Sequence, residues 1–249
     1  MSGHSKWATI KHKKGAADAK RGKLFAKLIK QVEVAARTGG GDLDANPTLR
    51  TMFQKARDNS VPLDTIERAV KRGTGELEGV NYESVTYEGY APGGVALYIE
   101  CLTDNRNRTS GDVRSTLSKH GGSLAEPGAV AWQFERKGVV LVPGDVDEDD
   151  LMLVALDAGA DDIVSDGGMW QVTSAPSELN AVRDALTEAG IGFESADLTM
   201  LPTSTVEVTE AGSAKQLLKL MELLDDLDDV QDVFANFDIS DELMETAAG

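Results

Sequence analysis

The amino-acid sequence predicts an α+β protein in which a small helical domain precedes small α+β sandwiches. Three observations predict this class. Apolar residues recur at helical spacing in residues 23–73, they alternate with a period of two from residue 82, and short strand and helix patterns then follow one another. With 249 residues, the chain is long enough for two or three compact units. The ββαβ and βαβ patterns are too short for a doubly wound parallel sheet.

Three short amphipathic helices are expected in the first part of the chain, over residues 23–41, 47–59 and 63–73. Pro47 suits the first turn of the second helix. A run of glycines ends the first helix, and Gly73 ends the third.

Strands and helices alternate after residue 82. Ser177 is a good N-cap for the helix that follows it, and Gly121 and Gly122 close an earlier helix. Strand patterns occur at residues 82–90, 95–102, 130–135, 139–142, 169–173, 205–209 and 230–237, and helix patterns at 110–120, 149–158, 177–189 and 214–224.

Charge is distributed very unevenly along the chain. The first 75 residues contain 16 Lys and Arg against 7 Asp and Glu, whereas the whole chain has a formal net charge of −17. A protein this acidic repels a polyanion unless its cations are gathered in one place. The asymmetry therefore indicates a nucleic-acid or anionic-surface partner for the basic part.

Residues 1–22 lack a helical period and are rich in Lys, Gly, His and Ala, so we interpret them as an extended or mobile basic arm. Its lysines suit phosphates, and Trp7 suits stacking on an exposed base. The alternative is a solubilising disordered tail. Against that alternative, Lys23, Lys27 and Lys30 are expected to continue the arm as one exposed stripe of a helix. The candidate nucleic-acid-binding residues of this region are Lys6, Trp7, Lys11, His12, Lys13, Lys14, Lys20, Arg21, Lys23 and Lys27. Arg50, Lys55, Arg57, Arg68, Lys71 and Arg72 would extend the surface across the helical domain.

A second candidate is the segment of residues 104–112, expected to be a loop between a strand and a helix. Arg106 and Arg108 flank an asparagine there and could contact an anion or an RNA backbone. The alternative is that Asn, Thr, Ser and Asp only provide the turn and the helix cap.

Enzyme chemistry has little support, and we predict a protein without catalytic residues, metal or cofactor. The three histidines have no spacing that suggests a triad, and Cys101 lies in an apolar strand pattern. The glycine clusters lack the frame of a Walker loop. The acidic runs at 147–150 and 225–229 lack EF-hand spacing and are interpreted as solvated faces.

The composition also limits location and partners. The longest apolar stretches are strand-sized, the N-terminus lacks the apolar core of a secretory signal, and one cysteine suits a reducing compartment. A soluble cytoplasmic protein with no membrane partner and no small-molecule substrate is expected. The oligomeric state stays open.

Both DNA and RNA remain possible targets. A basic three-helix unit suggests a helix-turn-helix, but its second and third helices are separated by residues 58–62 and lack an obvious base-reading set of Arg, Asn and Gln. A Lys/Gly arm with one tryptophan matches irregular RNA better.

The motifs of this chain resemble the YebC/PmpR family, which includes mitochondrial translational activators of cytochrome oxidase. The segments that carry the resemblance are GHSKWATIKHKKGAADAKRGKLFAKLIK, NPTLRTMFQKARDNSVPLDTIERAVKRGTG and YEGYAPGGVALYIECLTDNRNRTSGDVRSTLSKHGG. The resemblance covers essentially the whole chain.

The resemblance implies three domains, the third inserted into the second. In this chain they correspond to a basic arm (1–22), a helical domain (23–78), a central ferredoxin-like α+β domain (79–136 and 203–249) and an inserted α+β domain (137–202). It also implies a non-enzymatic regulator of gene expression. Our interpretation is a translation factor that contacts ribosomal RNA and assists difficult nascent sequences. The alternatives are a DNA-binding transcriptional regulator and a protein-interaction scaffold.

Overall fold

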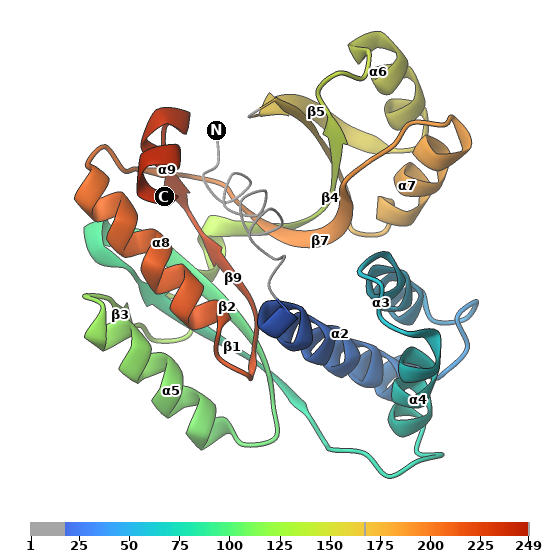
Figure 1. The fold of residues 1–249 in the computed structure, drawn as a ribbon, viewed down its shortest axis with the longest axis horizontal. Helices are drawn as coiled ribbons and strands as arrows, with labels where there is room; N and C mark the ends of the chain where they lie inside the picture. Colours follow the sequence, from blue (N-terminus) through green and yellow to red (C-terminus); the bar gives the residue numbers. More distant parts are fainter. Residues whose placement is uncertain (1–17, 167, 249) are drawn as a thin grey trace.

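The computed structural model describes residues 18–166 and 168–248, which form three units around a common junction (Figure 1). One unit is helical, and the other two each pack helices on an antiparallel sheet. The predicted α+β class and the N-terminal helical unit are therefore confirmed.

The helical unit consists of α2 (Asp18–Gly39), α3 (Pro47–Asp58) and α4 (Leu63–Gly73). α3 and α4 begin and end where the sequence predicts. α2 begins five residues before the expected start at Lys23, so residues 18–22 belong to the helix and not to an extended arm. Buried side chains of the three helices form one apolar core, whose largest members are Leu28, Leu49 and Ile66.

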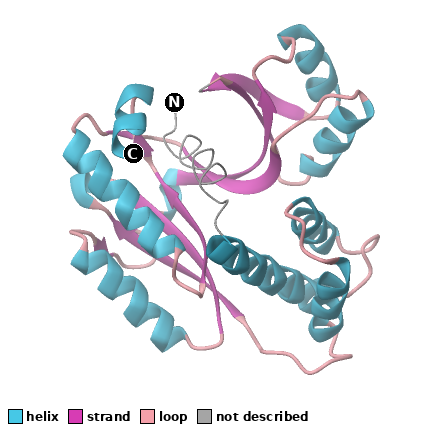
Figure 2. Cartoon of the chain, in the orientation of Figure 1, coloured by secondary structure: helices cyan, strands magenta, loops and turns pink. Residues whose placement is uncertain are grey.

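The central unit has two layers. Its sheet is antiparallel in the order β3-β1-β2-β9, and buried side chains of α5 and α8 pack against one face of it (Figure 2). A short parallel pair of β8 and β10 lies beside it. The elements are β1 (Glu83–Tyr90), β2 (Ala96–Thr103), α5 (Arg106–Lys119), β3 (Ser123–Leu124), β8 (Val206–Glu207), α8 (Ala211–Asp225), β9 (Val230–Ala235), β10 (Phe237–Asp238) and α9 (Asp241–Ala248), with short 3-10 turns at Pro92–Gly94 and Ala131–Gln133.

The inserted unit has the element order βαββαβ and the sheet order β5-β6-β4-β7, which is the ferredoxin-like arrangement. We expected this arrangement for the central unit, which has the same two layers but begins with a hairpin of β1 and β2. The elements of the inserted unit are β4 (Phe134–Pro143), α6 (Glu148–Asp157), β5 (Ala160–Asp166), β6 (Met169–Ser174), α7 (Leu179–Glu188) and β7 (Ser195–Pro202).

β4 connects the central and inserted units as one continuous strand. The sequence predicts two separate strands, at residues 130–135 and 139–142, but Lys137 and Gly138 between them lie inside β4 and pair with β7. Phe134, at the start of the strand, packs in a core with central-unit residues, whereas Val140 and Val142 pack in the core of the inserted unit. The boundary expected between residues 136 and 137 therefore falls within a strand that both units share.

Several elements give no clear signal in the sequence. β3, β5, β7 and α9 were not predicted, and α7 begins at Leu179 with no side-chain cap from Ser177. All but one residue of β7 are half-buried, so it lacks the alternation that marks a strand with one buried face. Among the described residues, no helix is long and apolar enough to cross a membrane.

Candidate nucleic-acid interface

The structure describes only part of the predicted interface. Lys20 lies in α2, but the structure does not describe its side chain. Arg21, Lys23, Lys27, Arg106 and Arg108 are described in full. The following candidates lie outside the described residues: Lys6, Trp7, Lys11, His12, Lys13 and Lys14.

The lysine stripe of α2 is docked on the central unit, so Lys27 and Lys30 are largely buried, whereas Lys23 is exposed as predicted. Lys23 Nζ lies 3.3 Å from Asp226 Oδ1, and Lys30 Nζ lies 3.4 Å from Asp229 Oδ1. Between them, Lys27 Nζ lies 2.9 Å from Asp225 Oδ1, and its side chain is only 11% exposed. The acidic run at residues 225–229, interpreted above as a solvated face, is therefore the partner of this stripe.

Lys23 and Lys27 also cap the end of α8, and Lys30 donates to a carbonyl of the segment that follows it. Lys23, Lys27 and Lys30 donate to the backbone carbonyls of Asp226, Asp225 and Asp228 at 3.0, 2.6 and 2.9 Å. The last carbonyls of a helix lack partners within it and carry a partial negative charge. Since the last turn of α8 contains no basic residue, lysines from α2 supply the compensating charge.

Arg108 is held by two carboxylates at the start of α5. It contacts Asp104 at 2.7 Å and Asp229 at 2.6 Å, and Thr109 Oγ1 donates to Asp229 at 2.8 Å. Burial alone would raise the pKa of Asp229, but the hydrogen bonds from Arg108 and Thr109 outweigh it and lower the pKa below its ordinary value. This network fixes the Arg108 side chain within the protein.

The segment around Arg106 belongs to a helix and not to a loop. α5 begins at Arg106, and the Asn105 side chain accepts from the backbone N–H of Arg108 at 3.1 Å, as an N-cap does. The structure therefore shows the helix cap that was the alternative interpretation of residues 104–112. Arg106 itself is 67% exposed and lies 3.9 Å from Glu83, so its guanidinium faces solvent.

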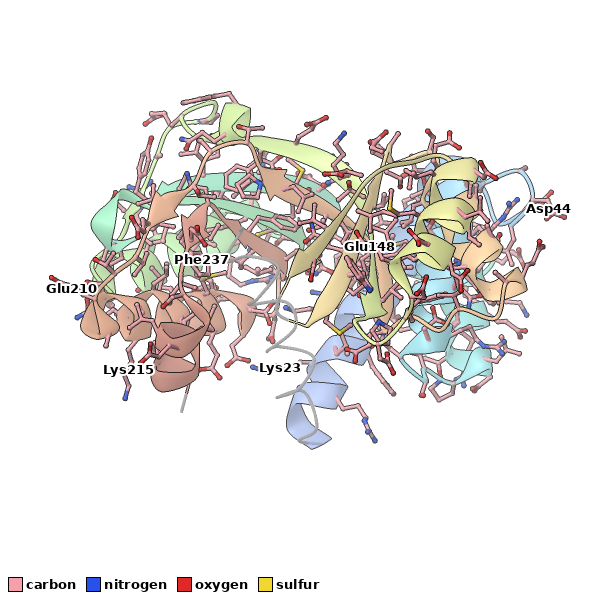
Figure 3. The ribbon with its side chains drawn as sticks, turned by 90° about the horizontal axis from the view of Figure 1, so that it is seen from above. Lys23, Asp44, Glu148, Glu210, Lys215 and Phe237 are labelled. Atoms are coloured by element: carbon pink, nitrogen blue, oxygen red, sulfur yellow. The ribbon has the colours of Figure 1, made fainter. Side chains whose placement is uncertain are left out.

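Most of the cations expected to extend the basic surface are also paired. Arg50, Arg68 and Arg72 contact Asp44, Asp64 and Glu33. A second group of cations is spread over the molecule, and no described carboxylate lies within ion-pairing distance of them. These cations are Arg21, Arg57, Lys71, Arg114, Lys119 and Lys215. Figure 3 labels Lys215 of this group, on α8, and also the paired Lys23, near the start of α2.

Lys55 joins the helical unit to the inserted unit. Its Nζ lies 2.9 Å from Asp197 Oδ1 on β7, and nearby Asn180 donates to Thr51 Oγ1 at 3.0 Å. Burial alone would lower the pKa of Lys55, but the negative charges of Asp197 and Asp232 raise it above its ordinary value. The ammonium therefore stays charged and holds α3 against β7.

Sequence reasoning missed the acidic partners of the α2 lysines. The sequence contained a signal for this contact. Three lysines recur at helical spacing on α2, and a short run of acidic residues that could pair with them follows nearly 200 residues later. Within residues 18–166 and 168–248, no three His, Cys, Asp or Glu side chains are grouped to hold a metal ion.

Comparison with known proteins gives a consistent result along the chain. Residues 5–76 match the N-terminal domain of the TACO1/YebC proteins, and residues 82–237 match the second and third domains. A relative from Rubrobacter xylanophilus, named a probable transcriptional regulatory protein, is 59% identical over the full length of both chains. One of the same name from Halothermothrix orenii is 57% identical over 98% of each.

A solved structure agrees with these relatives. The crystal structure of a conserved hypothetical protein from Aquifex aeolicus is 45% identical and superposes with a TM-score of 0.81, covering 90% of this chain and 93% of that one. The family match spans all three units and both sides of the lysine-mediated contact. The chain therefore belongs to the TACO1/YebC family.

Proposed function

We propose that this protein is a nucleic-acid-binding regulator of gene expression, in which the basic arm contacts ribosomal RNA. The observation that carries the proposal is the distribution of charge. Residues 1–22 contain six Lys and Arg against one Asp, whereas the other residues sum to −22. An acidic body keeps nonspecific polyanions away, so that a shaped site reached by the arm is favoured.

The described contacts refine which cations would serve this function. Lys23, Lys27 and Arg108 are engaged with Asp226, Asp225 and Asp229, so we assign them to positioning the arm rather than to phosphate contacts. The phosphate and base contacts then fall to Lys6, Trp7, Lys11, His12, Lys13, Lys14, Lys20 and Arg21, with exposed Arg106 as a separate contact.

RNA is favoured over DNA by the chemistry of the arm. Lysine supplies sequence-independent phosphate contacts, and a single tryptophan can stack on an unpaired base, which irregular RNA presents more often than a duplex does. The helical unit also directs its α2 lysines at α8, which argues against α2 lying in a major groove.

A DNA-binding transcriptional regulator is the second candidate, and the names of the relatives favour it. It predicts tight selection of a defined duplex sequence at physiological salt. A protein-interaction scaffold, the third candidate, predicts complexes that survive nuclease treatment.

The test is sedimentation of cell lysate on a sucrose gradient, with and without ribonuclease. The intact protein is compared with a variant in which Lys11, Lys13 and Lys14 are changed to Gln. The control changes Arg114, Lys119 and Lys215 to Gln, which removes the same charge from exposed sites elsewhere. We expect ribosome co-migration that the arm variant loses and the control keeps. Co-migration that is equal in both variants would overturn the proposal.

A further inference from the structure

A cavity of about 1460 Å³ lies where the three units meet. Its walls come from α2 of the helical unit, β7 of the inserted unit, and α8 and β9 of the central unit (Figure 1). Arg106 is not among its lining residues, whereas Arg21 is.

The cavity lies along the edges of two sheets. β7 and β9 are the outermost strands of their sheets in the described structure. Residues 195–199 of β7 and 231–234 of β9 all line the cavity. Successive side chains of a strand point to opposite faces, so a cavity that contacts every residue in turn lies beside the strand edge.

The edge of β9 presents backbone hydrogen-bonding groups to this space. Asn236 donates its backbone N–H to Ala96 of β2, and the pairing continues with Tyr98 opposite Phe234. Because neighbouring residues of an antiparallel ladder alternate in direction, the N–H and C=O of Val233 and Ala235 point away from β2. Of the two, Val233 lines the cavity, so its N–H and C=O are the groups that an added strand can reach.

Gln231 provides a second, independent observation that points to a ligand. The register of β2 and β9 shifts between Glu100 and Cys101, which leaves Gln231 opposite no residue, in a β-bulge. Gln231 is 5% exposed and is one of the residues that line the cavity, yet neither of its buried amide atoms has a hydrogen-bond partner in the described structure. The buried Oε1 of Gln31, across the cavity on α2, also lacks one. Buried amides without partners are costly and rare, so both indicate a ligand with donors and acceptors.

The charge of the walls selects between a polypeptide and a nucleic acid. The lining contains seven Lys and Arg and seven Asp and Glu. A site for a phosphate backbone requires an excess of cations. A balanced lining with apolar side chains such as Phe193 and Leu141 suits an uncharged extended peptide.

We propose that this cavity binds an extended polypeptide segment of a partner, which adds as a strand to the edge of β9 and hydrogen-bonds to the Gln231 amide. Strand addition to an open sheet edge gives affinity through main-chain hydrogen bonds. The partner segment is therefore uncharged at its centre and rich in β-branched residues.

The test uses the full-length chain and a fluorescent, acetylated and amidated octapeptide of alternating Thr and Val. A second peptide carries N-methyl groups on alternate residues, which removes the donors of one edge. Gln231→Leu removes the cavity amide, and Gln54→Leu, outside the cavity lining, is the matched control. Anisotropy gives affinity, and hydrogen exchange reports protection at residues 231–235.

We expect the parent peptide to bind and to protect the amide of Val233, which lines the cavity. N-methylation and Gln231→Leu should each weaken binding by about tenfold or more, and Gln54→Leu should not. Gln231→Leu should keep its melting temperature, which separates lost binding from lost folding. Equal binding of both peptides, or no binding, would overturn the proposal. So would displacement by a short uridine oligonucleotide, or binding that appears only after residues 1–17 are removed. Since no nucleic acid is needed, these results are independent of the proposed function.

Discussion

Lys27 Nζ lies 2.9 Å from the Asp225 carboxylate and 2.6 Å from the carbonyl oxygen of the same residue. One ammonium thus forms an ion pair and also caps a helix end. The two residues lie 198 positions apart in the chain. Because Lys27 is nearly buried, the pair is shielded from solvent. It ties α2, the helix that follows the arm, to α8 of the central unit.

Removing this ammonium should destabilise the protein more than removing its exposed neighbour. We expect Lys27→Met to lower the free energy of unfolding by about 2 kcal/mol, because the half-buried Asp225 carboxylate loses this ammonium and the end of α8 loses a cap. Lys23, which is 48% exposed, makes the same kind of contact, so Lys23→Met should cost less than about 1 kcal/mol. Urea denaturation measures both. Equal losses would show that burial of the pair contributes nothing.

Gly73 is required where α4 crosses α2. A Cβ at this position would collide with the carbonyl oxygen of Glu33 and lie 2.7 Å from the Ala36 Cβ. Gly73→Ala should therefore cost about 2 kcal/mol or more, since two helix backbones must move apart. At Gly22, also helical, nothing lies within 4 Å, and Gly22→Ala should stabilise by about 0.5–1 kcal/mol. Thermal unfolding of both variants should show shifts of opposite sign.

Glu88 should make stability depend on pH. It accepts three backbone N–H groups, from Gly128, Val130 and Ala131, at 2.6, 2.6 and 2.9 Å. Burial alone would raise its pKa, but these donors lower the pKa below the ordinary 4.5. Its contribution is therefore complete above about pH 4.5 and is lost as pH falls through the lowered value.

The variant that tests this is Glu88→Gln. It should cost about 2 kcal/mol at pH 7, because one donor then faces an amide NH₂. The difference from the unmodified protein should shrink as the pH falls below 4.5, where the carboxylate itself is protonated. Urea titrations from pH 3 to pH 7 measure the difference. A constant difference would contradict the assignment.

Cys101 should be inert in the folded protein. Its thiol is buried in the core of the central unit, and burial, together with the negative charge of Asp229, raises its pKa to about 12. At pH 8, roughly one thiol in ten thousand would be a thiolate. We expect no reaction with a disulfide reagent until urea unfolds the central unit. Rapid labelling of the native protein would contradict this burial.

The arm should give RNA binding a measurable salt dependence. Each phosphate contact on single-stranded RNA contributes about 0.7 to the slope of log affinity against log salt concentration. Changing Lys11, Lys13 and Lys14 to Gln should therefore reduce the slope by about 2. The same change at Arg114, Lys119 and Lys215 should leave it unaltered. Filter binding from 50 to 300 mM salt measures the slopes.

Local signals explain which elements the sequence predicted well. α3 and α4 begin and end as expected because Pro47 and Gly73 act through backbone geometry within a few residues. β5 and β7 were missed because they lack a clear alternation of buried and exposed side chains. The start of α5 was placed too late because Asn105 caps a helix whose first turn is polar.

By itself, the sequence determined the fold class, the three-helix unit, the family and the uneven charge, because these depend on composition and on patterns within a few residues. Tertiary structure alone decided that the Lys27 stripe is paired, that β4 is shared by two units, and that Gln231 is buried beside a cavity. Each of these depends on residues far apart in the chain. A lysine at a given spacing has the same local pattern whether solvent or a carboxylate 198 residues away lies opposite it.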